Sequence, residues 1–185
     1  GAEGAQRYHE TTGRDIPIGE DGCYVTIHRE GHRTRVGADF MGYKHLYYYA
    51  GEHGWAFSNS LIALVRHLRA HNVPLSIDRA QLMAWSHLKP FTAQAASFRT
   101  AVDEIRILPS FCCLEIEHHQ LSVVAQAPLE QRPYTEALEH FITLWLGRMA
   151  ALLRQNTLSV IADLTGGRDS RTVLSLFLAC LLYTS

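Results

Sequence analysis

The stretch from Leu158 to Arg171 reads LSVIADLTGGRDSR, and it decides how the rest of the chain is interpreted. Its first part, residues 158–164, is almost entirely apolar, as is typical of a strand buried on both faces of a parallel sheet. Two glycines and a polar stretch follow, and we predict that a helix begins at about Ser170. The segment therefore predicts the opening strand, loop and helix of a parallel α/β domain.

The loop of this segment has the composition of an anion site. In open α/β sheets, ligands bind beyond the carboxyl ends of the strands. Gly166 and Gly167 permit close approach of the backbone, and their N–H groups, with those of the first helical turn, can surround an anion. Thr165 and Ser170 each add a hydroxyl donor, and the Asp169 carboxylate suits a bound Mg²⁺. We predict a site for metal-bound pyrophosphate.

Two better-known phosphate loops are excluded by spacing. No Lys follows the glycines as a Walker A loop requires, and the pattern is not G-x-G-x-x-G. A glycine turn with a capped helix and no ligand is the alternative, because Asp and Ser are good N-cap residues. The position after an apolar strand favours the ligand-binding interpretation.

The front of the chain alternates short β-rich segments with turns. Four strands joined by tight turns indicate an antiparallel sheet, and they are expected at Cys23–Ile27, Arg33–Ala38, His45–Ala50 and Trp55–Phe57. Helices are expected at Ser60–His71 and from Asp78, where Asp78 and Gln81 resemble a capping box. Leu82, Met83 and Trp85 would form the apolar surface of the second helix. Residues 1–20 show no periodicity and are predicted to be loop.

Strands are expected again at residues 105–108, 111–117 and 121–127. Pro128 and Pro133 bracket a linker, and a long amphipathic helix is predicted from Tyr134 to about Arg154. We therefore predict two domains, residues 1–130 and 131–185. The predicted fold class is antiparallel α+β followed by α/β.

Composition limits the partners. The 185 residues include 17 basic and 18 acidic ones, so no nucleic-acid footprint is expected. The four cysteines form no C-x-x-C pair, which argues against a disulfide framework and favours a reducing, cytoplasmic setting. The longest apolar run, Thr172–Tyr183, is too short to span a bilayer, so no membrane partner is expected. The adjacent His118 and His119 are expected to be solvated turn residues rather than metal ligands.

Several segments together resemble a known family. Leu164–Arg171 resembles the S-G-G-x-D-S loop of the PP-loop ATP pyrophosphatases, with Thr165 in place of Ser. Asp39–Tyr48 resembles the D-x-x-G-x-x-P-L-Y-Y segment of asparagine synthetase glutaminase domains, with His45 in place of Pro. Phe57–Ser60 resembles the F-A-S-E segment of that domain, and Ile105–Ser110 resembles a segment that ends in Pro-Gly. These matches cover most of residues 22–172 and indicate an asparagine synthetase-related protein.

The resemblance implies a fold and a reaction. Residues 1–130 would form a class II glutamine amidotransferase-like domain of the Ntn-hydrolase type, an antiparallel sandwich incomplete at its N-terminus. Residues 131–185 would begin a PP-loop ATP-binding domain that is incomplete at its C-terminus. ATP and Mg²⁺ are the implied cofactors. ATP would adenylate a small-molecule carboxylate, and ammonia would then attack the acyl-adenylate to form an amide. A homodimer is compatible with this assignment.

The implied site residues follow from the same loop. Thr165, Gly166, Gly167, Asp169 and Ser170 would hold the pyrophosphate, with Asp169 contacting Mg²⁺ through it. The main chain at Leu164 would face the adenine. Asp163 is expected to bond backbone or Arg171, and a contribution to the metal site is the alternative.

Glutamine hydrolysis is not expected from this chain. The family uses an N-terminal Cys nucleophile, whereas this chain begins with Gly1, and Cys23 is internal and expected in the core. Either the sequence starts after the nucleophile or the protein is a relative that has lost it, so both ammonia and glutamine stay open as nitrogen sources. Two other functions stay open: another PP-loop enzyme, such as a tRNA-modifying or sulfur-transfer enzyme, and a non-catalytic binding module. The chain alone is expected to be inactive and to associate through an apolar helix face around Leu174, Phe177 and Leu181.

Overall fold

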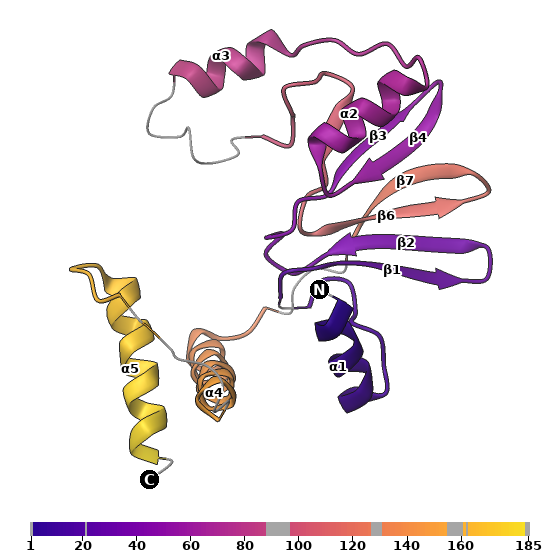
Figure 1. Cartoon of the computed structure of the whole chain (residues 1–185). Helices are drawn as coiled ribbons and strands as arrows, with labels where there is room; N and C mark the ends of the chain where they lie inside the picture. Colours follow the sequence, from indigo (N-terminus) through magenta and orange to yellow (C-terminus); the bar gives the residue numbers. More distant parts are fainter. Residues whose placement is uncertain are drawn as a thin grey trace. The chain divides into compact units, whose positions relative to one another are not determined.

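A computed structural model shows a mixed α and β protein with antiparallel sheets, which confirms the coarse fold class (Figure 1). It describes residues 2–20, 22–87, 97–126, 131–154, 161 and 163–183. The chain divides into two compact units, Gly1–Pro128 and Leu129–Ser185, and the division lies two residues before the predicted boundary at 130/131. The Ntn-hydrolase and PP-loop identities of these units stay predictions.

The first unit contains two antiparallel sheets. Sheet A has the strand order β1-β2-β6-β7, and sheet B has the order β4-β3-β5. The strands are β1 (Val25–Glu30), β2 (Arg33–Ala38), β3 (Tyr47–Gly51), β4 (Gly54–Ser58), β5 (Ile105–Ile107), β6 (Cys112–Glu117) and β7 (Gln120–Ala125). The single four-stranded sheet expected from the first four strands is wrong. β2 pairs instead with β6, and β3 pairs with β5, because partners distant in sequence complete each hairpin.

Two apolar clusters organise the first unit into layers. One contains Val36, Leu46 and Leu114, with Tyr48 and Phe57 of sheet B packed against it, so it joins the two sheets. The other lies between sheet B and α2 (Leu61–Ala70), and it contains Tyr49, Leu64, Leu68, Val73 and Ile105. The tyrosines of β3 therefore alternate faces, as the period of a strand requires.

Side-chain caps mark the starts of two helices in the first unit. The hydroxyl of Ser60 accepts a hydrogen bond from the amide of Ala63 and caps α2. The carboxylate of Asp78 accepts from the amide of Gln81 at the start of α3 (Arg79–His87), which is one of the two bonds of a capping box. The second bond is not formed, because the amide of Asp78 donates to the carbonyl oxygen of Ala101. Leu82 and Met83 are exposed, so the expected apolar surface of α3 is not buried within the described residues.

Residues 2–12 form a helix, so the prediction of a loop over residues 1–20 was wrong there, whereas residues 13–20 contain no helix or strand. α1 spans Ala2–Thr12 and ends at Gly13, whose positive φ of 69° suits a helix C-terminus. Gln6 donates a hydrogen bond to Glu10 one turn later. The described side chains of α1 are almost all exposed, so good helix-forming residues rather than an apolar stripe explain it. A prediction based on apolar periodicity therefore could not detect it.

The second unit contains two helices among its described residues. α4 (Tyr134–Leu153) matches the predicted long helix, and α5 (Arg168–Tyr183) begins two residues before the predicted start. The two helices contact one another, and Met149 and Cys180 are buried. In the part of the chain that the structure describes, no helix is long and apolar enough to cross a membrane.

Candidate functional site

The structure describes residues 161, 163 and 164 of the strand predicted before the loop. Residues 158–160 and Ala162 lie outside the described residues. Ile161 is 89% exposed and Leu164 is 62% exposed, and neither belongs to a strand, so the expected burial is wrong for these two residues. A buried parallel strand needs neighbouring strands, and the described residues of the second unit contain only α4 and α5.

The loop itself is organised by the hydroxyl of Ser170. The backbone N–H of Thr165 donates to Ser170 Oγ across 3.2 Å, and the two hydroxyls lie 3.0 Å apart. The N–H of Gly167 donates to Thr165 Oγ1 at 3.3 Å. Both hydroxyls predicted to bind phosphate are therefore brought together at the start of α5, where each is bonded within the loop.

The amides of Thr165 and Gly167 are bonded within the loop, so the donors left for an anion belong to the first turn of α5. The first N–H groups of an α-helix have no acceptor within the helix, and in α5 these belong to the turn that starts at Arg168. The partial positive charge of a helix N-terminus adds to the attraction for an anion. Arg171 does not contact Asp163 as one alternative proposed. Its guanidinium donates to the carbonyl oxygens of Gly166 and Gly167.

The two glycines leave open space at the surface. A Cβ added at Gly166 would meet no atom within 4 Å, and one added at Gly167 would meet only Thr165 Oγ1 at 3.3 Å. Neither glycine has a positive φ, so their backbone conformation does not demand glycine. The absence of a side chain at Gly166, rather than a strained backbone, is thus the property that would let a ligand approach the loop.

Asp169 lies in the first turn of α5 with an exposed side chain. Within the described residues it forms no ion pair, and no group of three or more His, Cys, Asp or Glu side chains could hold a metal ion by itself. A single exposed carboxylate fits a Mg²⁺ that arrives with a nucleotide, because Mg²⁺ is commonly bound by one or two carboxylates plus phosphates. The residues present therefore fit Mg²⁺ carried by ATP.

A comparison with models of protein families finds no match for this chain, and a comparison with curated proteins finds none either. The resemblance to asparagine synthetases therefore rests on the residues quoted above.

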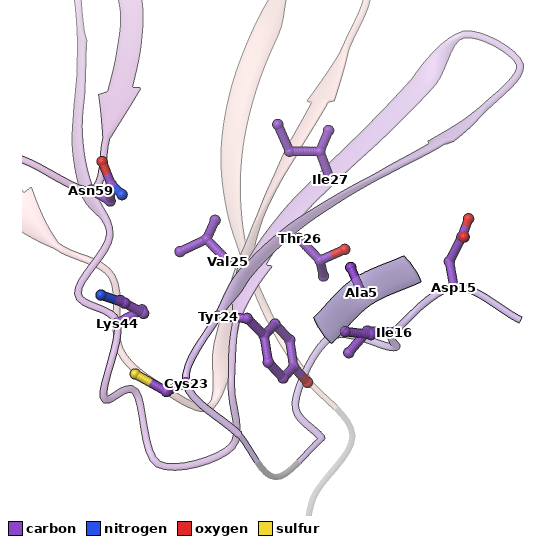
Figure 2. Close-up of a pocket in the computed structure, with 10 residues that line it drawn as sticks. All are labelled: Ala5, Asp15, Ile16, Cys23, Tyr24, Val25, Thr26, Ile27, Lys44 and Asn59. Atoms are coloured by element: carbon purple, nitrogen blue, oxygen red, sulfur yellow. The ribbon is translucent and has the colours of Figure 1, made fainter. Parts of the chain in front are cut away.

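A second candidate site lies in the first unit beside β1. A cavity of about 620 Å³ is lined by Cys23, Lys44 and Asn59, by residues of β1, and by Asp15 and Ile16 (Figure 2). Figure 2 shows the Cys23 thiol, the Lys44 side chain and the Asn59 amide along one side of this cavity. Cys23 is exposed and precedes β1, so the expectation of a core cysteine was wrong.

Buried Asp39 holds the backbone of the segment that carries Lys44, one of the residues that line this cavity. Its side chain is fully buried and accepts hydrogen bonds from the amides of Tyr43 at 2.9 Å, Lys44 at 3.1 Å and Tyr24 at 3.4 Å. These bonds join the start of β1 to the loop that carries Lys44. The sequence pattern identified Asp39 as the first residue of a family segment, but its anchoring role becomes visible only in the structure.

Tyr24 completes the cavity floor. Its hydroxyl donates to the carbonyl oxygen of Pro17 at 2.8 Å and lies 3.0 Å from that of Glu20. Burial raises the pKa of this hydroxyl to about 12, although the contact with the Glu20 carbonyl acts in the opposite direction. Tyr24 is therefore neutral at physiological pH and serves as a hydrogen-bond donor.

Proposed function

We propose that the chain is part of an ATP-dependent, amide-forming ligase of the asparagine synthetase type. The loop Thr165–Ser170 would bind the pyrophosphate of ATP, and ammonia would attack a substrate carboxylate activated as an acyl-adenylate. The observation that carries this proposal is the convergence of two hydroxyls, the unobstructed Gly166 and one exposed carboxylate at the N-terminus of α5.

The roles of the loop residues follow from their chemistry. Thr165 and Ser170 would exchange their mutual hydrogen bond for bonds to phosphate oxygens, since a hydroxyl can both donate and accept. Gly166 and Gly167 would let the phosphate approach the backbone, and the main chain at Leu164 would face the adenine. ATP with its Mg²⁺ supplies the activating phosphoanhydride and the charge that stabilises the departing pyrophosphate.

The hydrogen bonds of Asp39 in the first unit support the assignment to the asparagine synthetase family. The D-x-x-G segment begins at a carboxylate that binds three backbone amides, which gives a structural reason for Asp at that position. We do not propose glutamine hydrolysis, because Cys23 follows Gly22 in the chain and has no free α-amino group to act as its base.

Carboxylate-dependent exchange of labelled pyrophosphate into ATP tests the proposal. The assay should use the gene product that carries this chain with all of its flanking sequence, and candidate carboxylates supplied singly. Exchange should occur with at least one carboxylate and should fall by about 100-fold or more in Asp169→Ala, because the Mg²⁺ contact is lost. Glu139→Ala, an exposed carboxylate on α4, is the matched control and should retain exchange.

Two results would redirect the assignment. Exchange without any carboxylate, or with a tRNA or sulfur carrier as the only cosubstrate, would favour a different PP-loop enzyme. Absence of both exchange and ATP binding would favour a non-catalytic module and contradict the proposal.

A further inference from the structure

A second cavity in the first unit is lined by residues of β4 and of the β1–β2 and β6–β7 hairpins. The two hairpins turn at the same end of sheet A (Figure 1). We call this cavity of about 700 Å³ the hairpin-end pocket. Arg29 pairs with Thr34 across β1 and β2, and Thr34 pairs with Ile116 across β2 and β6. Directly opposed residues point to the same face, so these three side chains form one row along the pocket.

An aromatic wall of the pocket comes from sheet B. Trp55 and Phe57 of β4 are stacked, with ring centroids 6.2 Å apart and an interplanar angle of 11°. The indole Nε1–H of Trp55 donates to the carbonyl oxygen of His119 across 2.9 Å. Because this bond fixes the indole ring to the β6–β7 turn, the aromatic wall is held in place before any ligand arrives.

The lining of the pocket includes basic side chains from both hairpins. They are Arg29, His32, His118 and His119. Within the described residues Arg29 forms no ion pair, whereas Arg33 and Arg35 both contact Glu115. Glu30 and Glu117 are the nearest acidic residues in sequence, but each follows a pocket residue on its strand and so points to the other face of sheet A.

The β6–β7 turn is held in an uncommon conformation. His118 and His119 have φ angles of 49° and 63°, in the left-handed region where Asn and Gly are the usual residues of such a hairpin turn. Each such residue carries a conformational cost, and costs of this kind often occur at ligand sites. Here the turn places two imidazoles and the Trp55 acceptor at the mouth of one cavity.

We propose that the hairpin-end pocket binds a planar aromatic anion, with the ring against Trp55 and Phe57 and the negative group toward Arg29 and the histidines. The volume lies within the range of small-molecule sites, and the combination of a flat apolar wall with a few basic groups is typical of them. A metal ion is a weaker fit, since no metal-holding group occurs among the described residues. All residues that line this pocket belong to the first unit, and its occupancy does not depend on the proposed ligase function.

Titration of the whole chain with 2-naphthoate tests this site by nuclear magnetic resonance. The chain has three tryptophans, and loss of one indole N–H signal in Trp55→Phe assigns the signal of Trp55. That signal should shift and saturate with 2-naphthoate. Binding should be at least about fivefold weaker for acetate, which lacks the ring, and for 2-naphthalenemethanol, which lacks the charge.

Variants separate this site from general adhesion to apolar surfaces. Arg29→Gln should weaken 2-naphthoate binding roughly two- to fivefold, the range expected for a solvent-exposed ion pair. Arg66→Gln, on the exposed face of α2, should leave it unchanged. His118→Asn removes a basic group but keeps a residue that tolerates the left-handed turn, so it should fold and bind more weakly.

The aromatic wall is tested by a matched pair of substitutions. Trp55→Ala should weaken binding about tenfold, in line with the contribution of one stacked aromatic ring, while Trp55→Phe should retain most of the affinity. Binding to Trp55→Phe is followed through the fluorescence of 2-naphthoate. A Trp55 signal that does not respond, equal binding of the neutral alcohol, or equal losses in Arg29→Gln and Arg66→Gln would each overturn the proposal.

Discussion

The guanidinium of Arg99 lies 2.6 Å from the carboxylate of Asp78, a side chain that is almost completely buried. The same carboxylate caps α3 by accepting from the amide of Gln81 at 2.9 Å. This one group therefore joins the start of a helix to the strand-like segment at Arg99, which are 21 residues apart in the chain.

We expect Asp78→Asn to destabilise the first unit, and the loss to depend on pH. The amide of Gln81, followed by the guanidinium of Arg99, holds the pKa of Asp78 below its ordinary value of 3.8. The charged form is thus favoured in the folded state, so its stabilisation is fully present above pH 3.8 and is lost as the pH falls through the lower folded pKa.

Urea denaturation of wild type and Asp78→Asn at pH 7 and near pH 3 measures this effect. The difference in unfolding free energy should shrink at the lower pH. Asp103→Asn is the matched control, because Asp103 contacts the same Arg99 at 2.8 Å from an exposed position. A loss of equal size in that control would show that the buried cap of α3 is not the source.

Asp39→Ala should cost roughly 3 kcal/mol of unfolding free energy, because a buried amide left without its acceptor costs about 1–3 kcal/mol and Asp39 serves three. Asp39→Asn retains one acceptor oxygen and should lose less. Chemical denaturation monitored by circular dichroism gives both values. If Asp39→Ala were as stable as wild type, the proposed anchoring of Tyr24 and Lys44 would be wrong.

The contrast between Cys23 and the other cysteines predicts a thiol count. Cys23 is exposed, whereas Cys112, Cys113 and Cys180 are buried. Burial also raises the pKa of the Cys112 thiol, which disfavours its reactive thiolate. A disulfide reagent should therefore modify one thiol per chain under native conditions and four in denaturant. Cys23→Ser should abolish the native reaction, and rapid modification of a second thiol would contradict the burial described.

The sequence was informative where signals are local. β2 occupies Arg33–Ala38 as predicted, α2 is capped by Ser60, and α4 begins at Tyr134. Hydroxyl caps, turn residues and apolar periodicity act over a few residues, so they can be recognised in the sequence itself. The loop Thr165–Ser170 was located in the same way, through its glycines and hydroxyls.

Long-range pairing was not predictable from the same signals. The guanidinium of Arg35 donates a hydrogen bond to Cys113 Sγ, which lies 78 residues away in the chain. No local sequence pattern predicts that β2 and β6 are neighbours. Exposure of Cys23 was also missed, because the strand begins two residues later than its β-rich pattern indicated. The hairpin-end pocket is lined by residues of three hairpins, β1–β2, β3–β4 and β6–β7, which lie apart in the sequence. Its residues therefore form no sequence motif from which the pocket could be predicted.

Apolar side chains on α5 predict association of this chain. Of the expected face, Leu181 is 53% exposed, whereas Leu174 and Phe177 are half-buried. Leu178 is 50% exposed, and α4 exposes Leu138, Phe141 and Ile142 as well. We expect concentration-dependent association in sedimentation experiments. Leu178→Lys should weaken it by about tenfold or more, since burying a leucine contributes about 1.5–3 kcal/mol. Ser175→Lys adds the same charge at an exposed polar position on α5 and should have a smaller effect.

Gly166→Ala separates ligand binding from folding at the loop. An added methyl group at Gly166 would meet no protein atom within 4 Å, and the backbone φ is not positive, so the fold should be unaffected. The same methyl group would occupy the space through which a phosphate would approach the backbone. Binding of Mg²⁺–pyrophosphate, measured by calorimetry, should therefore weaken by roughly tenfold, about 1.4 kcal/mol.

Gly147→Ala is the matched control, because Gly147 lies within α4 and its added methyl group also meets no atom within 4 Å. This substitution should stabilise the helix by about 0.5–1 kcal/mol without changing the affinity for pyrophosphate. Equal affinity in wild type and Gly166→Ala would mean that the anion does not approach this glycine, and the pyrophosphate assignment of the loop would then be wrong.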